Sequence, residues 1–552
     1  MQKTLLLPVL LLALDARAAP SAGEHYFLRN CAMCHSTSSA AGAGPGLAGT
    51  FGRTLGSAPG YGYSDAMARA GAAGRTWDAS TLDAYLADPG AAVPGTSMPL
   101  NVARKADRDT VIAYLATLGA PAPAPAGAAL ASTPFTEDAP GTLHLIKPSE
   151  LVAPFATASA GNAPKVVPRP EGALPRVPAG FKVNLFATDA DKGRLMIRAP
   201  NGDVFMSVAH KGKIKVFRSS DGERADIESD FIIGLDRPFG IAFYPSGDNP
   251  RYLYVATVNQ VIRIPYQRGA LKAGAPPQVV VPTLTAAKGS HSSRTLVFSA
   301  DDRQMFVSIG SATNVADTMD PAPPVPLAQW ERKYGLGAAW GDELDRAVVL
   351  SFDPEGQQRH TYATGLRNCV GMGVYPPTGA LFCAVNERDA LGDRLPPDYL
   401  TSVTRGGFYG WPWYYIGANE DPRLPGKRPD LRNKVTVPDV LLPAHSAPLG
   451  MAPYIAPRGA RHIFPKEYNG DIFLALHGSW NSATRSGSKV VRVMMRNGRP
   501  TGAFQDFVTG MVINHKEVWG RPSSVLVARD GSMLVDDDAN GHIWRIVPDK
   551  SL

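Results

Sequence analysis

The stretch Gly202-Asp203-Val204-Phe205-Met206-Ser207 sets a pattern that the chain repeats. A turn residue is followed by alternating apolar residues and then by a polar end, which is typical of a short strand. The pattern returns at residues 251–256, 303–308, 379–384, 470–475 and 531–536. A strand pattern that recurs at roughly 50- to 90-residue intervals is typical of β-propeller blades with insertions.

These repeats predict that residues 176–552 form an all-β propeller with six blades. A seventh blade would need another copy of the pattern, and we find none in the sequence. A β-sandwich is the alternative fold, but it would not require a repeat of this kind.

A basic residue precedes the apolar strand that lies upstream of each repeat. The residues are Arg194, Arg237, His291 with Arg294, Arg367 with Asn368, His445, and Arg521. Because the innermost strands of a propeller begin near its axis, these side chains are expected to form a positive ring there. Such a ring suits a ligand with several carboxylates, whereas any one of these residues alone is more typical of a surface ion pair.

The motif Cys31-Ala32-Met33-Cys34-His35 predicts covalent attachment of haem c. Within a helical stretch over 26–35, Cys31 and Cys34 share one face, so both thiols can add to one haem while His35 binds its iron. A zinc or redox site is the alternative. Zinc would need two more ligands nearby, and this part of the chain has no further cysteine.

The sixth iron ligand is predicted to be Met98, which lies in a rigid polar loop at residues 94–99. Met67 is the competing candidate, but its Ala-rich helical surroundings favour a packing role. A Met/His ligand pair raises the haem potential and suits electron transfer.

The chain is predicted to be multidomain. Residues 20–120 form a small all-α unit with further helical patterns at 80–86 and 105–118. Residues 121–175 form an Ala/Pro-rich linker, which predicts a semi-rigid extended tether with some segments packed on a neighbour. Residues 1–19 have the charged start, apolar run and small-residue end of a signal peptide, an uncleaved anchor being the alternative.

Composition agrees with an exported globular protein. The chain has 552 residues, 44% of them hydrophobic, and a formal net charge of +7 with scattered basic residues and no nucleic-acid motif. We expect a periplasmic or secreted protein without a transmembrane segment after signal removal. There Cys369 and Cys383 either form a disulfide or remain as two buried thiols, and the sequence favours neither.

Residues 20–120 resemble a class I cytochrome c. The resemblance is carried by the haem motif and by Gly44-Pro45, Phe51-Gly52-Arg53, Ala58-Pro59-Gly60-Tyr61 and Tyr63-Ser64-Asp65-Ala66. It implies that the Pro45 carbonyl accepts a hydrogen bond from His35. It also implies that Tyr63, Trp77 and Arg53 surround the haem propionates.

Residues 176–549 resemble the soluble pyrroloquinoline quinone-dependent sugar dehydrogenases, especially their sorbosone dehydrogenase-like branch. The shared motifs are Gly289-Ser290-His291, Thr364-Gly365-Leu366-Arg367-Asn368, Gly406-Gly407-Phe408-Tyr409-Gly410-Trp411-Pro412 and His477-Gly478-Ser479-Trp480-Asn481. The resemblance implies bound pyrroloquinoline quinone with Ca²⁺, and a sugar, sugar aldehyde or related alcohol as substrate.

The same resemblance implies roles for individual residues. His291 is the general base, and Arg367 and Asn368 bond the quinone oxygens. Arg485 and Lys489 are candidates for the cofactor carboxylates. Arg388 and Asp389 lie where the family has its calcium loop, although this chain departs from the glucose enzymes there and after Trp480.

The leading hypothesis is a quinohaemoprotein dehydrogenase, in which the haem receives the electrons and an external cytochrome or respiratory component accepts them. The alternative is a non-enzymatic electron-transfer cytochrome with a propeller used for docking. A metal-dependent, lactonase-like propeller would need carboxylate and Asn side chains at the axis, and the ring of Arg residues argues against it.

Overall fold

The computed structural model describes residues 21–31, 35, 37, 44–58, 61–98, 100–118, 135–286, 289–316 and 319–549. They divide into two compact units. The smaller contains residues 21–31, 37 and 46–118, and the larger contains residues 35, 44–45 and the described part of 135–549. The predicted signal peptide, Cys34 and residues 121–134 of the linker lie outside the described residues.

The smaller unit is helical, as predicted. Its helices are α1 (Ala22–Asn30), α2 (Asp65–Ala72), α3 (Ala79–Ala87), α4 (Pro89–Ala92) and α5 (Lys105–Thr117). Short polar side chains begin three of them: Ser64 Oγ accepts from the Met67 amide, and Asp78 and Asp88 do the same for Thr81 and Ala91. Such N-caps satisfy amides that the first turn leaves unpaired.

Helices α1 and α5 cross closely because Gly23 has no side chain. A Cβ at Gly23 would lie 2.3 Å from the Thr110 carbonyl oxygen. The rings of Phe27 and Tyr114 then meet with centroids 5.6 Å apart. The helix predicted over 26–35 instead ends at Asn30, where the Cys31 amide closes the last turn on the Phe27 carbonyl, so the haem motif follows the helix.

The described part of the larger unit contains six antiparallel sheets arranged as propeller blades. The first three, innermost strand first, are β4 (Leu195–Arg198), β5 (Val204–Val208), β6 (Lys213–Arg218) and β7 (Ile227–Ile232); β8 (Ile241–Tyr244), β9 (Tyr252–Ala256), β10 (Val261–Pro265) and β11 (Gln278–Val281); and β12 (Leu296–Phe298), β13 (Met305–Ile309), β14 (Val348–Phe352) and β15 (His360–Thr364) with β19 (Gly407–Phe408) at its edge.

The other three blades follow in the same order. They are β16 (Cys369–Tyr375), β17 (Ala380–Val385), β18 (Pro397–Val403) and β22 (Val440–Ala444); β23 (Pro448–Pro453), β24 (Ile472–Leu476), β25 (Lys489–Arg496) and β26 (Arg499–Val508) with β1 (Leu143–His144) at its edge; and β28 (Pro522–Val527), β29 (Met533–Asp537), β30 (His542–Pro548) and β3 (Phe181–Ala187).

The innermost strands surround one axis. Each contacts the innermost strand of the next blade, in the order β4, β8, β12, β16, β23 and β28, and β28 contacts β4 again. The six sequence repeats are the second strands of the blades. All five residues of β5, β13 and β24 are buried, which explains their nearly continuous apolar character.

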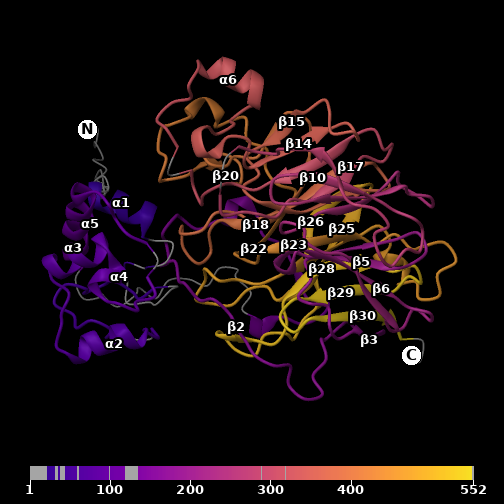
Figure 1. Cartoon of the computed structure of the whole chain (residues 1–552), viewed down its shortest axis with the longest axis horizontal. Coiled ribbons are helices and arrows are strands. Elements are labelled where there is room, and N and C mark those ends of the chain that lie inside the picture. The colour runs from indigo at the N-terminus through magenta and orange to yellow at the C-terminus, as the bar shows by residue number, and fades with distance from the viewer. Residues whose placement is uncertain are drawn as a thin grey trace, which may run out of the picture. The chain divides into compact units, whose positions relative to one another are not determined.

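The ring is closed by strands from opposite ends of the unit. Figure 1 shows β3 beside β30, and the register pairs Val183 with Ile546 and Asn184 with Arg545. The last blade therefore takes its outermost strand from the start of the propeller sequence.

The described part of the linker is built onto the propeller. Strand β1 extends the fifth blade by pairing with β26, and β2 (Lys165–Val166) runs parallel to β27 (Glu517–Val518). Residues 135–175 therefore belong to the larger unit, in agreement with the expectation that part of the tether packs on a neighbour.

Two insertions rich in aromatic residues pack together beside the third blade. The first, between β13 and β14, contains α6 (Leu327–Tyr334), and the second, between β19 and β22, contains β20 (Tyr414–Tyr415) and β21 (Asn419–Glu420). The side chains of Trp330, Trp340 and Trp413 are buried in their core. Among the helices of the described residues, we find none that is both long and apolar enough to span a bilayer.

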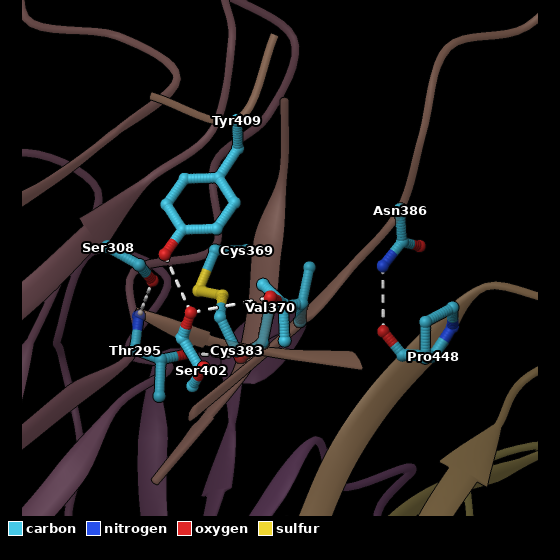
Figure 2. The surroundings of a disulfide bond; sticks show 10 residues. Thr295, Ser308, Cys369, Val370, Cys383, Asn386, Ser402, Tyr409 and Pro448 are labelled. Atoms are coloured by element: carbon cyan, nitrogen blue, oxygen red, sulfur yellow. Dashed lines mark hydrogen bonds between the residues drawn. A yellow bond between two sulfur atoms is a disulfide. The ribbon is translucent and has the colours of Figure 1, made fainter. Parts of the chain in front are cut away.

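Cys369 and Cys383 form a disulfide between β16 and β17, which decides between the two alternatives left by the sequence (Figure 2). The register of these strands shifts next to Cys369, so Val370 has no partner on β17. Its carbonyl oxygen instead accepts from the Thr295 hydroxyl on the neighbouring blade. The disulfide thus holds the irregular start of β16, immediately after Arg367 and Asn368.

Candidate functional site

The predicted basic residues lie just before the innermost strands. Arg194 precedes β4, Arg237 precedes β8, Arg294 precedes β12, Asn368 precedes β16, His445 precedes β23 and Arg521 precedes β28. Because those strands surround the axis, the residues come to one end of it from blades far apart in sequence. Burial, followed by the charges of Arg346 and Arg237, lowers the pKa of Arg294 to about 9.

His291 is held as a neutral imidazole. Its Nδ1 atom lies 2.7 Å from the Ser311 carbonyl oxygen. Since a carbonyl oxygen only accepts, Nδ1 carries the proton and donates it, and Nε2 keeps its lone pair. Removal from bulk water, followed by the charge of Arg367, lowers the pKa of His291 to about 3. The ring is therefore a base that stays unprotonated at neutral pH.

The loop that orients His291 is fixed by Glu343. One carboxylate oxygen accepts from the Ala312 amide at 2.7 Å, and the other accepts from the Thr313 amide at 2.8 Å and from the Thr313 hydroxyl. Burial raises the pKa of Glu343 to about 7. Glu343 is fully buried. Because it lies about 30 residues from the loop that it holds, the sequence does not indicate its role at the site.

Arg367 is buried among several oxygen acceptors. It donates to the Glu387 carbonyl at 2.7 Å, to Asn314 Oδ1 at 3.0 Å and to Asp389 Oδ2 at 3.2 Å. Asp389 also lies 3.3 Å from Nδ1 of His445. Burial opposes ionisation of Asp389, but the hydrogen bond from His445 and the charge of Arg367 together hold its pKa below the ordinary value.

Asn368 offers an unused acceptor beside His291. Its Oδ1 is buried without a hydrogen-bond partner among the described residues. A Cβ added to Gly310 would lie 2.3 Å from this oxygen and 2.8 Å from the His291 Cβ. Gly310 thus leaves the space in which the two side chains sit together. An orphaned buried acceptor next to a neutral base fits a bound molecule that carries N–H or O–H groups.

A second cluster lies at the same end of the axis. His477 Nε2 lies 2.9 Å from Asp538, and Arg521 donates to its Nδ1, also at 2.9 Å. Arg194 forms an ion pair with Asp538. The sequence pointed to Arg194 and Arg521 by their place before a strand and to His477 by its motif, but no signal marked Asp538.

The side chain of Arg388 does not bind a cation, so its predicted place at the calcium site rests on its backbone alone. Its fully buried guanidinium donates to Glu387 at 2.8 Å, to Asp421 at 2.9 Å and to the carbonyls of Pro412 and Tyr414. A positive side chain with these partners supports the loop from behind. Asp389 therefore remains as the acidic member of the predicted pair.

The two candidates for the cofactor carboxylates have other partners. Lys489 donates to Asp138 at 2.6 Å and lies 2.8 Å from Asp506, so its charge serves the junction with the linker. Arg485 donates to the carbonyls of Asn162, Ser479 and His515. Both side chains are buried and, apart from Arg485 Nε, bonded to protein groups, so their role as ligands of the cofactor carboxylates stays a prediction.

The haem residues are described in part. His35 Nδ1 lies 2.9 Å from the Pro45 carbonyl, as the resemblance implied, so Nε2 is the nitrogen left for iron. A Cβ at Gly44 would lie 2.3 Å from His35 Cε1, so this glycine lies directly on the imidazole. This fixed, singly hydrogen-bonded imidazole fits an axial ligand of haem iron.

The remaining haem candidates lie in the smaller unit. Met98 is partly exposed and packs against its hydrophobic core, whereas Met67 is buried within α2. Tyr63 contacts Tyr61 with ring centroids 4.8 Å apart, and Trp77 contacts Tyr85 at 5.0 Å. Arg53 donates to the carbonyls of Gly46 and Ala48.

Comparison with known proteins identifies both parts of the chain. The chain belongs to the TrAA12-like family, which matches residues 175–395 and 429–549, and the cytochrome c family matches residues 20–119. A cytochrome c2 from Rhodomicrobium vannielii is 44% identical over 105 residues, covering 18% of this chain and 81% of its own. An uncharacterised protein from Borreliella burgdorferi is 26% identical over 387 residues, covering 68% of this chain and 91% of its own.

Two solved structures share the propeller fold. The holo form of the pyrroloquinoline quinone domain of pyranose dehydrogenase from Coprinopsis cinerea aligns with a TM-score of 0.53 at 19% identity, covering 69% of this chain and 98% of that one. The calcium structure of a family AA12 enzyme from Trichoderma reesei aligns with a TM-score of 0.53 at 19% identity, covering 68% and 97%.

The chain thus joins a cytochrome c domain to a propeller of the TrAA12-like family. The predicted fold class, a cytochrome c domain followed by a six-bladed propeller, is confirmed for the part of the chain that the structure describes.

Proposed function

We propose that this protein is a quinohaemoprotein dehydrogenase. It oxidises a sugar, a sugar aldehyde or a related alcohol with pyrroloquinoline quinone and delivers the electrons to its own c-type haem. An external cytochrome or respiratory component then accepts them, in the periplasm or outside the cell. The observation that carries this proposal is the neutral, partly exposed His291 next to Arg367 and Asn368, in a chain that also has a cytochrome c domain.

Different residues of the propeller accept the substrate proton and bind the cofactor. His291 Nε2 accepts the proton of the substrate hydroxyl, while Nδ1–H remains on the Ser311 carbonyl. Arg367 and Asn368 bind and orient the cofactor from one side of the axis. Arg194 and Arg521 offer charge to its carboxylates from the other side, with His477 between them. Bound pyrroloquinoline quinone supplies the two-electron acceptor.

Calcium is proposed to lie next to Asp389. The described residues contain no group of three or more His, Cys, Asp or Glu side chains that could hold a metal ion. A site here would therefore use the Asp389 carboxylate together with backbone carbonyls and the cofactor itself. Oxygen ligands of that kind suit Ca²⁺.

The haem is proposed to be attached to Cys31 and Cys34, with His35 and Met98 as iron ligands and Tyr63 and Trp77 near the propionates. Haem c supplies a one-electron acceptor, and the Met/His pair favours transfer over oxygen chemistry. The Pro45 carbonyl keeps the His35 imidazole in one orientation.

The test is reduction of the haem by substrate. Full-length protein reconstituted with pyrroloquinoline quinone and Ca²⁺ should show the reduced haem spectrum when aldoses or aldehydes are added. His291→Ala should abolish that reduction and leave chemical reduction by dithionite unchanged. If a broad panel of sugars and aldehydes never reduces the haem, the protein is not this enzyme.

A titration with the quinone distinguishes the proposed dehydrogenase from the alternative function. An electron-transfer cytochrome with a propeller used for docking would show normal haem redox behaviour but would not bind the quinone. The basic residues that precede the innermost strands, Arg194, Arg237, Arg294 and Arg521, suit an anionic ligand and therefore favour the enzyme.

A further inference from the structure

Residues 155–162, which we call the strap, lie between the stretch that matches cytochrome c and the stretch that matches the TrAA12-like family. They lie outside both matched stretches. The sequence of the strap is Phe-Ala-Thr-Ala-Ser-Ala-Gly-Asn, with no periodic pattern. Its place in the structure is nevertheless specific, because it is hydrogen-bonded to two loops at the site.

The first of these loops is 389–393. The Phe155 amide donates to the Leu391 carbonyl at 2.8 Å. In the other direction, the Gly392 amide donates to Ser159 Oγ at 2.9 Å and the Asp393 amide donates to Thr157 Oγ1 at 2.8 Å. Two successive amides of the loop thus depend on two hydroxyls of the strap.

Gly392 shows how closely strap and loop approach. Its φ is +114°, in the region that favours glycine. A Cβ there would lie 3.0 Å from the Thr157 carbonyl oxygen and 3.1 Å from Thr157 Oγ1. The loop adopts a glycine-only conformation at the point where the strap lies on it.

The second loop is 480–485. The Asn162 amide donates to the Trp480 carbonyl at 2.6 Å, and Arg485 donates to the Asn162 carbonyl at 2.8 Å. Asn481 of this second loop binds both the strap and the first loop. Its Nδ2 donates to the Ala160 carbonyl of the strap at 3.2 Å, and its Oδ1 accepts from the Ala390 amide of the first loop at 3.1 Å.

A short chain of contacts leads from the strap to Arg367. The amide of Gly392 donates to Ser159 Oγ, and the carbonyl oxygen of the same residue accepts from His445 Nε2 at 3.0 Å. His445 Nδ1 lies 3.3 Å from Asp389, and Asp389 lies 3.2 Å from Arg367. Moving the Gly392 peptide would move the acceptor that holds His445 and would release Asp389 from Arg367.

We propose that Thr157 and Ser159 of the strap are positioning residues of the site, which hold loop 389–393 so that Asp389 keeps Arg367 in the orientation that binds the cofactor. This inference rests on the proposed function for its cofactor, but the contacts it concerns belong to the protein alone. The segment that connects the two units therefore also holds the loop that carries Asp389.

The test uses the full-length double variant Thr157→Val/Ser159→Ala, which removes both hydroxyl acceptors with little change of shape. We expect the dissociation constant for pyrroloquinoline quinone to rise about tenfold, with an unchanged haem spectrum. In the protein without quinone, amide hydrogen exchange should become faster at Asp389 and Ala390 as well as at Gly392 and Asp393. Ser159→Ala alone should give a smaller effect in the same direction.

Two further variants serve as controls. Thr157→Ser/Ser159→Thr keeps both hydroxyls and should retain the affinity of the unaltered protein. Ser299→Ala/Thr378→Val removes matched acceptors of the Gln304 and Ala380 amides in the β12–β13 and β16–β17 turns, away from the strap, and should change neither readout.

The two proposals fail in different ways. If exchange rises only at Gly392 and Asp393 while Asp389, Ala390 and the quinone affinity stay unchanged, the strap does not position the site. If the unaltered protein does not bind the quinone, the proposed function fails, and the exchange rates at Asp389 and Ala390 still decide the role of the strap.

Discussion

The Nδ1 atom of His291 lies 2.7 Å from the carbonyl oxygen of Ser311, and this contact determines which nitrogen of the imidazole can act as a base. The Ser311 carbonyl is itself held in place, because the next two residues of the loop, Ala312 and Thr313, donate to buried Glu343. A carboxylate that touches no reacting atom thus sets the orientation of the proposed base.

Stability should depend on pH through His291. Its pKa is about 3 in the folded protein, below the ordinary value of about 6.5 that it regains on unfolding. Between those values the unfolded chain binds a proton that the folded chain does not, so stability falls as the pH falls from 6.5 towards 3. His291→Gln should reduce the loss of unfolding free energy between pH 7 and pH 5 in urea titrations. An equal loss in both proteins would mean that His291 has the same pKa in the folded and the unfolded chain.

Gly310→Ala should weaken quinone binding. The added Cβ would lie 2.3 Å from Asn368 Oδ1 and would push this side chain away from His291. We expect at least about a tenfold rise in the dissociation constant, measured by titration of the protein without quinone. Gly274→Ala is the matched control, since a Cβ added there would meet nothing within 4 Å. Equal affinity in both variants would show that Asn368 plays no part in binding.

Removing the disulfide should cost stability. Cys369 and Cys383 are 14 residues apart, and a cross-link closing a loop of that length contributes about 3 kcal/mol in the chain-entropy description. Cys369→Ala/Cys383→Ala should lower the unfolding free energy of the propeller by about that amount in urea. The quinone affinity should also fall, because Arg367 and Asn368 directly precede the bond. A variant with unchanged stability would contradict the first expectation.

Gly44→Ala should alter the haem without altering the propeller. Its Cβ would lie 2.3 Å from His35 Cε1, so the imidazole would have to leave the Pro45 carbonyl. We expect a changed haem spectrum and a shifted midpoint potential, with normal quinone binding. Gly90→Ala, whose nearest contact is an ordinary 3.5 Å to Asp88, should leave the spectrum as it is.

The parts of the fold that are local in sequence could be predicted. The six repeats could be recognised because they are the second strands of the blades. A strand that is buried on both faces has a nearly continuous apolar sequence. The basic residues before the first strands, including Arg194 and Arg521, could be placed because each precedes the apolar strand that lies upstream of a repeat. The haem motif needed no more than five consecutive residues.

Roles that depend on distant partners could not be predicted. Arg485 binds the Asn162 carbonyl 323 residues away, and Lys489 binds Asp138 351 residues away, so their sequence neighbours give no sign that these charges are already used. Arg388 is occupied by Asp421, 33 residues further along the chain. Glu343 and the strap were missed for the same reason: a single carboxylate and an aperiodic run carry no pattern.

The pairing of β3 with β30 has a consequence for how the protein is made. As the ribosome releases the chain, the four main strands of each of the first five blades emerge one after another, so each sheet can form in turn. Strand β1, which pairs at the edge of the fifth blade, emerges long before its partner β26. Residues 181–187, however, have no partner until residues 542–548 have emerged. For most of synthesis the propeller is an open arc with an exposed strand, which other chains could capture. Export before folding, or a chaperone that covers this strand, would protect the nascent protein until its two ends meet.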